Sequence, residues 1–164
     1  MKKINPINFK GMPYNYAQVS SFISRSAKPD QYEFIWLKDN GVTDIIDFSR
    51  EDEDNMFWYS ESEIVEQLGI RYHRLPFSAK NPSDTIADNF LKIVDDVKAN
   101  NGKLHIHCLM GADRTGVMVY IYKMLNNIGN AFDNLQEVMS RGHNDKRYPK
   151  LLPWAKKYLQ SKLH

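Results

Sequence analysis

The stretch LHIHCLMGADRTG, residues 104–116, contains the motif on which the predicted fold and site depend. Residues 103–107 form a short apolar segment that is typical of a strand. Residues 117–125 are apolar on nearly every side, which is typical of a buried helix. Cys108 and Arg114 enclose five residues between these two elements. The sequence therefore predicts a tight strand-to-helix loop that begins at a cysteine and ends at an arginine.

The loop between Cys108 and Arg114 has the composition of an anion site. A tight loop at a helix N-terminus turns successive backbone N–H groups inward, and the helix dipole adds partial positive charge. Arg114 supplies a planar fork that matches two phosphate oxygens. The same field favours the thiolate form of Cys108, which can attack phosphorus and give a cysteinyl phosphate that water then hydrolyses. We therefore expect the nucleophile and the phosphate-binding groups to lie in the same loop.

The run HCLMGADRTG resembles the H-C-x-x-G-x-x-R-[ST]-G signature of the protein tyrosine phosphatase superfamily, with every fixed position present. The resemblance implies that Cys108 is the nucleophile, that Arg114 binds phosphate and stabilises the transition state, and that Thr115 eases departure of the thiolate. It also implies that His107 orients the loop and tunes the cysteine. The substrate-binding residues expected from it are His107, Leu109, Met110, Gly111, Ala112 and Thr115.

Two earlier segments are similar to the small atypical dual-specificity phosphatases of this superfamily. ISRSAKPD, residues 23–30, is similar to their Y-R-S-x-Q-P phrase. GVTDIIDFSRE, residues 41–51, is similar to their G-[IV]-x-x-[IV]-[IV]-[DN]-L-R-x-E strand. Phe48 and Ser49 stand where leucine and arginine are usual, so Arg50 is offset by one place from the arginine of the family.

Strand-like and helical segments alternate along the chain. The expected strands lie at residues 19–26, 42–48, 70–75 and 103–107, and the expected helices at residues 31–40, 61–68, 84–100, 117–125, 131–140 and after Pro149. This alternation predicts one α/β domain over residues 1–164, with a central, mostly parallel sheet of four to five strands flanked by helices. The site is then expected at the carboxyl ends of the strands. The charged run REDEDN, residues 50–55, is expected to be a solvated loop.

Composition narrows the expected partners and location. A formal net charge of +2 over 164 residues permits an anionic substrate without indicating nucleic acid. Cys108 is the single cysteine, which excludes an intramolecular disulfide and suits a reducing cytoplasm. No segment is apolar over the roughly 20 residues that span a membrane, so integral membrane association is not expected. Thiolate chemistry on phosphate needs no metal, and we expect neither metal nor cofactor.

The sequence leaves two aspartates as candidates for the acid that protonates the leaving oxygen. The superfamily carries an aspartate in the loop before its penultimate helix, but residues 76–79 (PFSA) contain no carboxylate. Asp84 is either a displaced acid or, with Ser83, the N-cap of a helix, and its spacing favours the cap. Asp113 is similar to the loop aspartate of myotubularin-like and bacterial phosphatases with a C-x-x-G-K-D-R-T-G loop, where it is a candidate acid. Its other interpretation is a brace on the loop backbone.

The expected function is hydrolysis of phosphate monoesters through a Cys108 phosphoenzyme, with phosphotyrosine, phosphoserine or phosphothreonine proteins as substrates. Inositol phosphates or phosphoinositides, small anionic esters, are the alternative. The basic residues 141–147 and Asp113 favour this alternative, whereas Ala112 stands where such enzymes carry lysine. A non-catalytic phosphate-binding module belongs to a different class, and the intact Cys108 and Arg114 disfavour it. An arsenate-reducing thiol enzyme usually needs resolving cysteines, and the chain has none.

Overall fold

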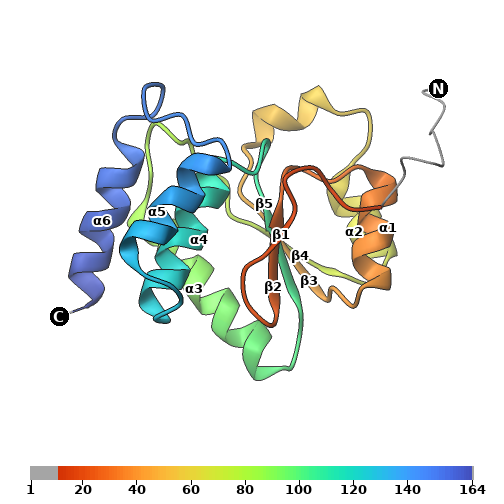
Figure 1. Ribbon diagram of the computed structural model, residues 1–164. Coiled ribbons are helices and arrows are strands. Elements are labelled where there is room, and N and C mark those ends of the chain that lie inside the picture. Colours follow the sequence, from red (N-terminus) through yellow and green to blue (C-terminus); the bar gives the residue numbers. More distant parts are fainter. Residues whose placement is uncertain (1–10, 164) are drawn as a thin grey trace.

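A five-stranded sheet forms the centre of the computed structural model, which describes residues 11–163 (Figure 1). The strand order is β1-β2-β5-β3-β4. β1 pairs with β2 in antiparallel orientation, and the other three pairs are parallel. The strands are β1 (Ala17–Gln18), β2 (Ile23–Ser26), β3 (Asp44–Asp47), β4 (Arg71–Arg74) and β5 (Leu104–His107). The expected mostly parallel α/β sheet is confirmed.

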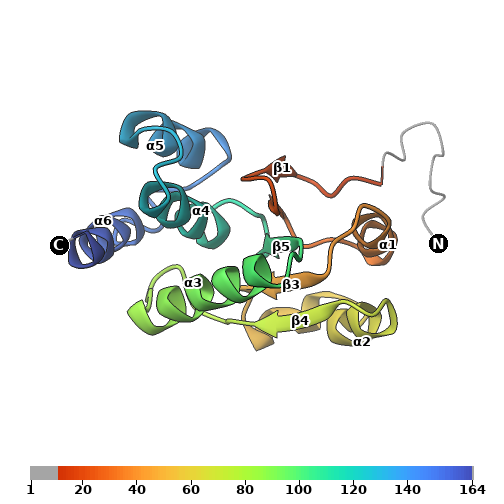
Figure 2. The ribbon, with the colours of Figure 1, turned by 90° about the horizontal axis from the view of Figure 1, so that it is seen from below.

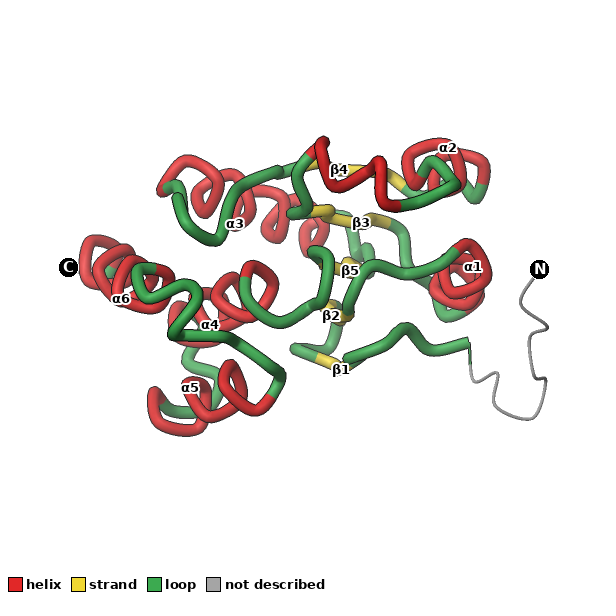
Figure 3. Tube along the Cα trace, turned by 90° about the horizontal axis from the view of Figure 1, so that it is seen from above, coloured by secondary structure: helices red, strands yellow, loops and turns green. Residues whose placement is uncertain are grey.

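Helices cover both faces of this sheet. Figures 2 and 3, which view the molecule from opposite ends, both place α1 and α2 on one face and α3, α4, α5 and α6 on the other. The helices are α1 (Gln31–Asp39), α2 (Glu61–Gln67), α3 (Asp84–Ala99), α4 (Arg114–Leu125), α5 (Ala131–Ser140) and α6 (Leu151–Lys162), with a 3-10 helix, η1 (Glu51–Met56), after β3. The domain is therefore a three-layer arrangement in which the sheet lies between two layers of helices.

Side chains at the helix N-termini fix where several helices begin. Asp30 accepts hydrogen bonds from the N–H groups of Tyr32 and Glu33, and the Glu33 carboxylate accepts one from the Asp30 N–H. This capping box starts α1. The Ser83 hydroxyl accepts a hydrogen bond from the Ile86 N–H and starts α3. The cap expected at residues 83–84 is therefore Ser83.

Two apolar clusters cover the two faces of the sheet. Successive side chains of β5 point to opposite faces and so belong alternately to one side or the other. Leu104, Ile106 and Cys108 belong to the larger cluster, with side chains of α3, α4 and α6. His105 and His107 point to the other face, where Phe34 of α1 contacts His107 edge-on. This period of two places the cysteine on the α3–α6 side and both histidines on the α1–α2 side.

Two expectations for the N-terminal half need correction. The segment 19–26 does not form one strand, because the N–H groups of Val19 and Ser20 bond to Ile23 O and close a hairpin between β1 and β2. The charged run 50–55 is mostly exposed, as expected, but most of it belongs to η1 rather than to a loop, and Glu53 is only 6% exposed. A buried positive partner, described below, is what draws this carboxylate inward.

The longest helix in the described part of the chain, α3, has 16 residues. None of the helices within residues 11–163 combines the length and the apolar character required to cross a bilayer.

Candidate active site

The Cys108–Arg114 loop is fastened by its carbonyl groups to residues outside it. The Leu109 carbonyl accepts a hydrogen bond from the Lys28 N–H at 3.0 Å, and the Gly111 carbonyl accepts one from Arg25 Nη2 at 2.7 Å. His107 Nδ1 donates to the Cys108 carbonyl at 2.9 Å. Three of the loop's carbonyls are therefore bonded on the protein side.

This pattern of carbonyl bonding orients the loop amides. In a planar trans peptide the C=O of one residue and the N–H of the next point in opposite directions. The N–H groups that follow Cys108, Leu109 and Gly111 in the chain are thus directed away from the protein body and toward the open side of the loop. Successive inward N–H groups of this kind form an anion-binding concavity, to which the N-terminus of α4 adds its dipole.

Gly111 is required by the close approach of the loop to β2. Its φ of +71° lies in the left-handed region, and a Cβ built there would lie 2.5 Å from Ala27 N and 2.5 Å from Ser26 C. A side chain at this position would push the loop off β2 and break the hydrogen bonds described above. Asn15 reinforces the same contact, since its Nδ2 donates to Gly111 O at 3.3 Å and to Arg141 O at 3.0 Å.

Arg25 is a fully buried cation beneath the loop. It is 0% exposed, and burial lowers its pKa to about 10, partly offset by the Glu137 carboxylate 3.6 Å from Nη1. Its Nε and Nη1 have no hydrogen-bond partner among the described residues. The charge of Arg25 also interacts favourably with a Cys108 thiolate. Arg25 therefore fixes the Gly111 carbonyl and contributes positive potential below the cysteine.

Cys108 and Arg114 line the same cavity, of about 440 Å³. Cys108 is 2% exposed and Arg114 is 9% exposed, so both lie at its base. Leu109 and Met110 also line it, and Met110 is 57% exposed at the rim. Glu53, Asp113, Lys80 and Arg147 contribute the charged side chains of the walls, together with Arg50. The Cys108 thiol and the Arg114 guanidinium thus line one cavity.

Glu53 positions the Arg114 guanidinium. Arg114 Nη1 donates to Glu53 Oε1 at 2.6 Å, and Nη2 donates to Oε2 at 2.9 Å. Burial alone would raise the pKa of Glu53, but the hydrogen bonds from Arg114 and from the Arg50 N–H lower it below its ordinary value. This bidentate ion pair occupies the Nη1 and Nη2 nitrogens of the guanidinium. The side of the guanidinium that carries Nε remains for an anion in the cavity.

The remaining predicted loop residues lie behind the cavity surface. Thr115 is fully buried, and its hydroxyl has no hydrogen-bond partner within residues 11–163. Such a hydroxyl is available to donate to a thiolate or to a bound oxyanion. Gly111 and Ala112 are also buried and are absent from the cavity lining.

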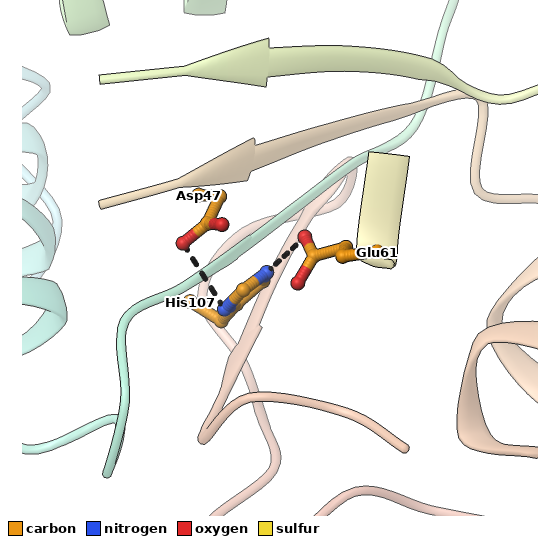
Figure 4. Close-up of side chains that lie close together, drawn as sticks. All are labelled: Asp47, Glu61 and His107. Atoms are coloured by element: carbon orange, nitrogen blue, oxygen red, sulfur yellow. Dashed lines mark hydrogen bonds and ion pairs between the residues drawn. The ribbon is translucent and has the colours of Figure 1, made fainter. Parts of the chain in front are cut away.

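His107 lies on the opposite face of the sheet from the cavity, between two carboxylates (Figure 4). Its Nε2 is 2.7 Å from Glu61 Oε2, and its Nδ1 donates to the Cys108 carbonyl. Because both partners are oxygens without hydrogens, both ring nitrogens carry protons. Burial lowers the pKa of His107, but the charges of Glu61 and Asp47 outweigh it and raise the pKa to about 9. His107 is therefore an imidazolium that fixes the backbone at Cys108.

Asp47, Glu61 and His107 have ligand atoms within 4.8 Å of one another, as a metal site would require. The cluster is already neutralised, since the His107 imidazolium and Lys28, 3.5 Å from Glu61 Oε1, balance the two carboxylates. A protonated imidazole has no free lone pair for a metal. Asp47 also accepts hydrogen bonds from Tyr72 and Ser49. The group therefore forms a buried ion-pair network.

The two candidate acids have different surroundings. Asp84 accepts a hydrogen bond from Trp154 Nε1 at 2.7 Å and does not line the cavity. Asp113 does line it, and its Oδ1 lies 2.6 Å from His143 Nδ1 and accepts a hydrogen bond from the Asn144 N–H at 2.9 Å. Asp113 thus joins the loop to the segment after α5, while its Oδ2 is left for other contacts.

Several residues of the site were not predicted from the sequence. Glu53 lay within a run of acidic residues, and nothing in that run distinguishes the one carboxylate that turns inward. Asn15 lies in an irregular segment, and its role depends on loops 95 to 126 residues away. Arg25 did carry a signal, because it stood inside a segment expected to be a strand and inside the ISRSAKPD phrase that resembles the family's arginine-containing one.

We expect Glu53→Ala to lower the free energy of unfolding by about 3 kcal/mol, because it leaves Arg114 without its carboxylate. Inorganic phosphate should then stabilise the variant more than the wild type, since it supplies the missing anion. Urea unfolding with and without phosphate measures both effects. Glu51→Ala, an exposed carboxylate of the same 3-10 helix, is the matched control. Equal stabilisation of Glu53→Ala and wild type by phosphate would contradict this account.

The His107–Glu61 pair should give stability a defined pH dependence. The pKa of His107 is about 9 in the folded protein, above the roughly 6.5 of an unfolded chain. Its contribution is therefore complete below pH 6.5 and is lost as the pH rises through 9. We expect the difference in unfolding free energy between wild type and Glu61→Gln to shrink over this range. Glu63→Gln, exposed on the same helix, serves as control, and a difference that stays constant with pH would refute the charged pair.

Two comparisons of the sequence with known proteins both find phosphatases. A family model described as "DSP-PTPase phosphatase fused to NAD+ Kinase" matches residues 12–150. A curated relative, "Probable tyrosine-protein phosphatase DG1060" of Dictyostelium discoideum, is 32% identical over 111 residues. That match covers 65% of this chain and 64% of the relative, so it spans just under two thirds of that protein.

Solved structures with low sequence identity share the fold. A putative phosphatase from Shewanella putrefaciens superposes with a TM-score of 0.75 at 21% identity, covering 95% of this chain and 96% of that one. The core catalytic domain of the PP-IP phosphatase SIW14 from S. cerevisiae gives a TM-score of 0.70 at 21% identity, covering 91% and 85%. The family model spans most of the chain and includes the whole Cys108–Arg114 loop. The chain therefore belongs to this DSP-PTPase phosphatase family of the protein tyrosine phosphatase type.

Proposed function

We propose that this chain hydrolyses phosphate monoesters through a phosphocysteine intermediate at Cys108, with residues 1–164 acting as one catalytic domain. The observation that carries the proposal is the loop itself. Its carbonyls at residues 108, 109 and 111 are bonded on the protein side, away from the cavity that Cys108 and the guanidinium of Arg114 line. This arrangement supplies a nucleophile, an anion seat and a transition-state cation together.

The proposed reaction proceeds in two displacements. The Cys108 thiolate attacks phosphorus, the bond to the ester oxygen breaks, and that oxygen takes a proton as it leaves. Arg114 binds the equatorial phosphate oxygens through its Nε edge, while Glu53 fixes the other edge. Water then attacks phosphorus and passes a proton to the Asp113 carboxylate left by the first displacement. The S–P bond breaks, and the free Thr115 hydroxyl stabilises the departing thiolate.

Asp113 is the acid that we assign to the first displacement. Two carboxylates of the described chain line the cavity, those of Glu53 and Asp113, and Glu53 is committed to Arg114. The Asp113 Oδ1 accepts the Asn144 N–H and contacts His143, so its Oδ2 is the oxygen available to the leaving group. Proton donation requires contact with the ester oxygen, and the position of Asp113 in the cavity wall supports it.

Two substrate classes fit this chemistry. Phosphorylated protein side chains are the first, and two relatives support them. One is named a probable tyrosine-protein phosphatase, and another, TpbA of P. aeruginosa, has been solved with phosphotyrosine. Small esters with several phosphate groups are the second class, and SIW14 is described as a PP-IP phosphatase. Lys80 and Arg147 favour the second class, because both line the cavity and neither forms an ion pair within residues 11–163.

Cys108→Ser should abolish turnover while inorganic phosphate still binds within about threefold of the wild-type affinity, because the backbone amides and Arg114 remain. Hydrolysis of p-nitrophenyl phosphate measures turnover, and calorimetry measures phosphate binding. Undiminished turnover in Cys108→Ser would eliminate the proposed nucleophile.

Asp113→Asn should slow an ester with a poor leaving group, such as phenyl phosphate, by about 100-fold, the lower end of general acid catalysis. Hydrolysis of p-nitrophenyl phosphate should be slowed far less, because its leaving group needs little protonation. Asp84→Asn is the matched control and should leave both rates unchanged. If Asp113→Asn slows both esters equally, Asp113 is a brace and not the acid.

A further inference from the structure

A second cavity, of about 250 Å³, adjoins the catalytic cavity. The two share four lining residues, Ala79, Lys80, Arg147 and Tyr148, and the second continues past them to Pro149 and Lys150. Since one water molecule occupies about 30 Å³ in the liquid, the space accommodates a tetrahedral phosphate group. The two cavities are therefore neighbours along the residues that they share.

The charges around the second cavity have one sign. Lys80, Arg147 and Lys150 line it, and no acidic residue of the described chain does. None of the three cations forms an ion pair with a carboxylate of residues 11–163, whereas Arg50 and Arg114 of the catalytic cavity both do. Three cations without counterions around one cavity produce a positive potential that attracts an anion.

Hydrogen bonds hold the main chain at two of these cations, Lys80 and Arg147, whose side chains are exposed. Lys80 sits in a tight turn, where its N–H donates to Ser78 Oγ and the Asn81 N–H donates to Ser78 O. The Arg147 N–H donates to Asn144 Oδ1. The Asn144 N–H in turn donates to Asp113 of the catalytic loop, so the wall that carries Arg147 is attached directly to the loop that carries Cys108.

The start of α6 adds to the same potential. Lys150 is the N-cap residue of this 12-residue helix, and no side chain accepts hydrogen bonds from its first turn. The Leu151 N–H donates to Tyr148 O and residue 153 is a proline, so what α6 adds is the positive end of its dipole at Lys150, which lines the cavity.

We propose that the Lys80–Arg147–Lys150 cavity is a second anion subsite, which binds another phosphate group of a small substrate whose scissile phosphate lies at Cys108. The inference rests on the proposed phosphatase function of the adjoining cavity, and it selects small polyphosphorylated esters as the substrate class. Because the two cavities share a wall, the two phosphates of the substrate must be close neighbours on a short framework. Arg147 lies between them and can contact both.

Binding of inorganic anions tests the subsite without depending on turnover. The probes are orthophosphate, which fills one seat, and tripolyphosphate, whose linked phosphates reach from one cavity to the other. Calorimetry with the full chain gives the ratio of the two affinities. We expect tripolyphosphate to bind the wild type about tenfold more tightly, from two added charge contacts at an exposed site.

Lys150→Gln should reduce this affinity ratio by about fivefold, and Lys150→Arg should retain it, because the charge remains. Lys157→Gln is the matched control, since Lys157 is an exposed lysine of the same helix that lines neither cavity. An equal loss in Lys157→Gln would overturn the proposal, because it would reveal a general charge effect. A wild-type ratio near one would overturn it as well.

Two further outcomes distinguish the second anion subsite from the proposed phosphatase function and from the assignment to small substrates. If the tripolyphosphate preference and its loss in Lys150→Gln are observed but Cys108-dependent turnover is not, the subsite stands and the proposed phosphatase function fails. If a doubly phosphorylated peptide depends on Lys150 more strongly than tripolyphosphate does, the assignment to small substrates is overturned.

Discussion

The orientation of the peptide groups between Cys108 and Arg114 is the constraint on which the site depends. Bonds from His107, Lys28 N–H and Arg25 pull the carbonyls of residues 108, 109 and 111 toward the protein, and the amides consequently face the cavity. Each bond comes from a different part of the structure: β5, the segment after β2, and β2 itself. The parallel pairing of β2 with β5 brings these donors to one loop. The fold thus supplies the anion seat through its strand order.

Most of the layered architecture follows from patterns that are local in the sequence. Alternating strands and helices predict a mostly parallel sheet, and the apolar run after Gly116 predicts the buried helix α4. The Cys108–Arg114 spacing identifies the loop because the loop is contiguous in sequence. The antiparallel strand β1 was not anticipated, since its two residues have no periodicity that a pattern could reveal.

The supporting carboxylates could not be predicted, because each depends on a contact between distant segments. Glu53 and Arg114 are 61 residues apart, and the carboxylate is recognisable only when η1 packs against the loop. Glu61 reaches His107 across 46 residues in the same way. Burying Arg114 or His107 without these partners would cost several kcal/mol. Acidic residues that look like solvated surface in the sequence therefore stabilise the two cations that define the loop.

Covalent catalysis by Cys108 is tested most directly by trapping the phosphocysteine intermediate. The full chain is mixed with a phosphate monoester, quenched in acid during the first turnover, digested, and analysed by mass spectrometry. We expect one added phosphoryl group on the peptide that contains Cys108, and none in Cys108→Ser. Product formation without this adduct, or an adduct on any other residue, would contradict it.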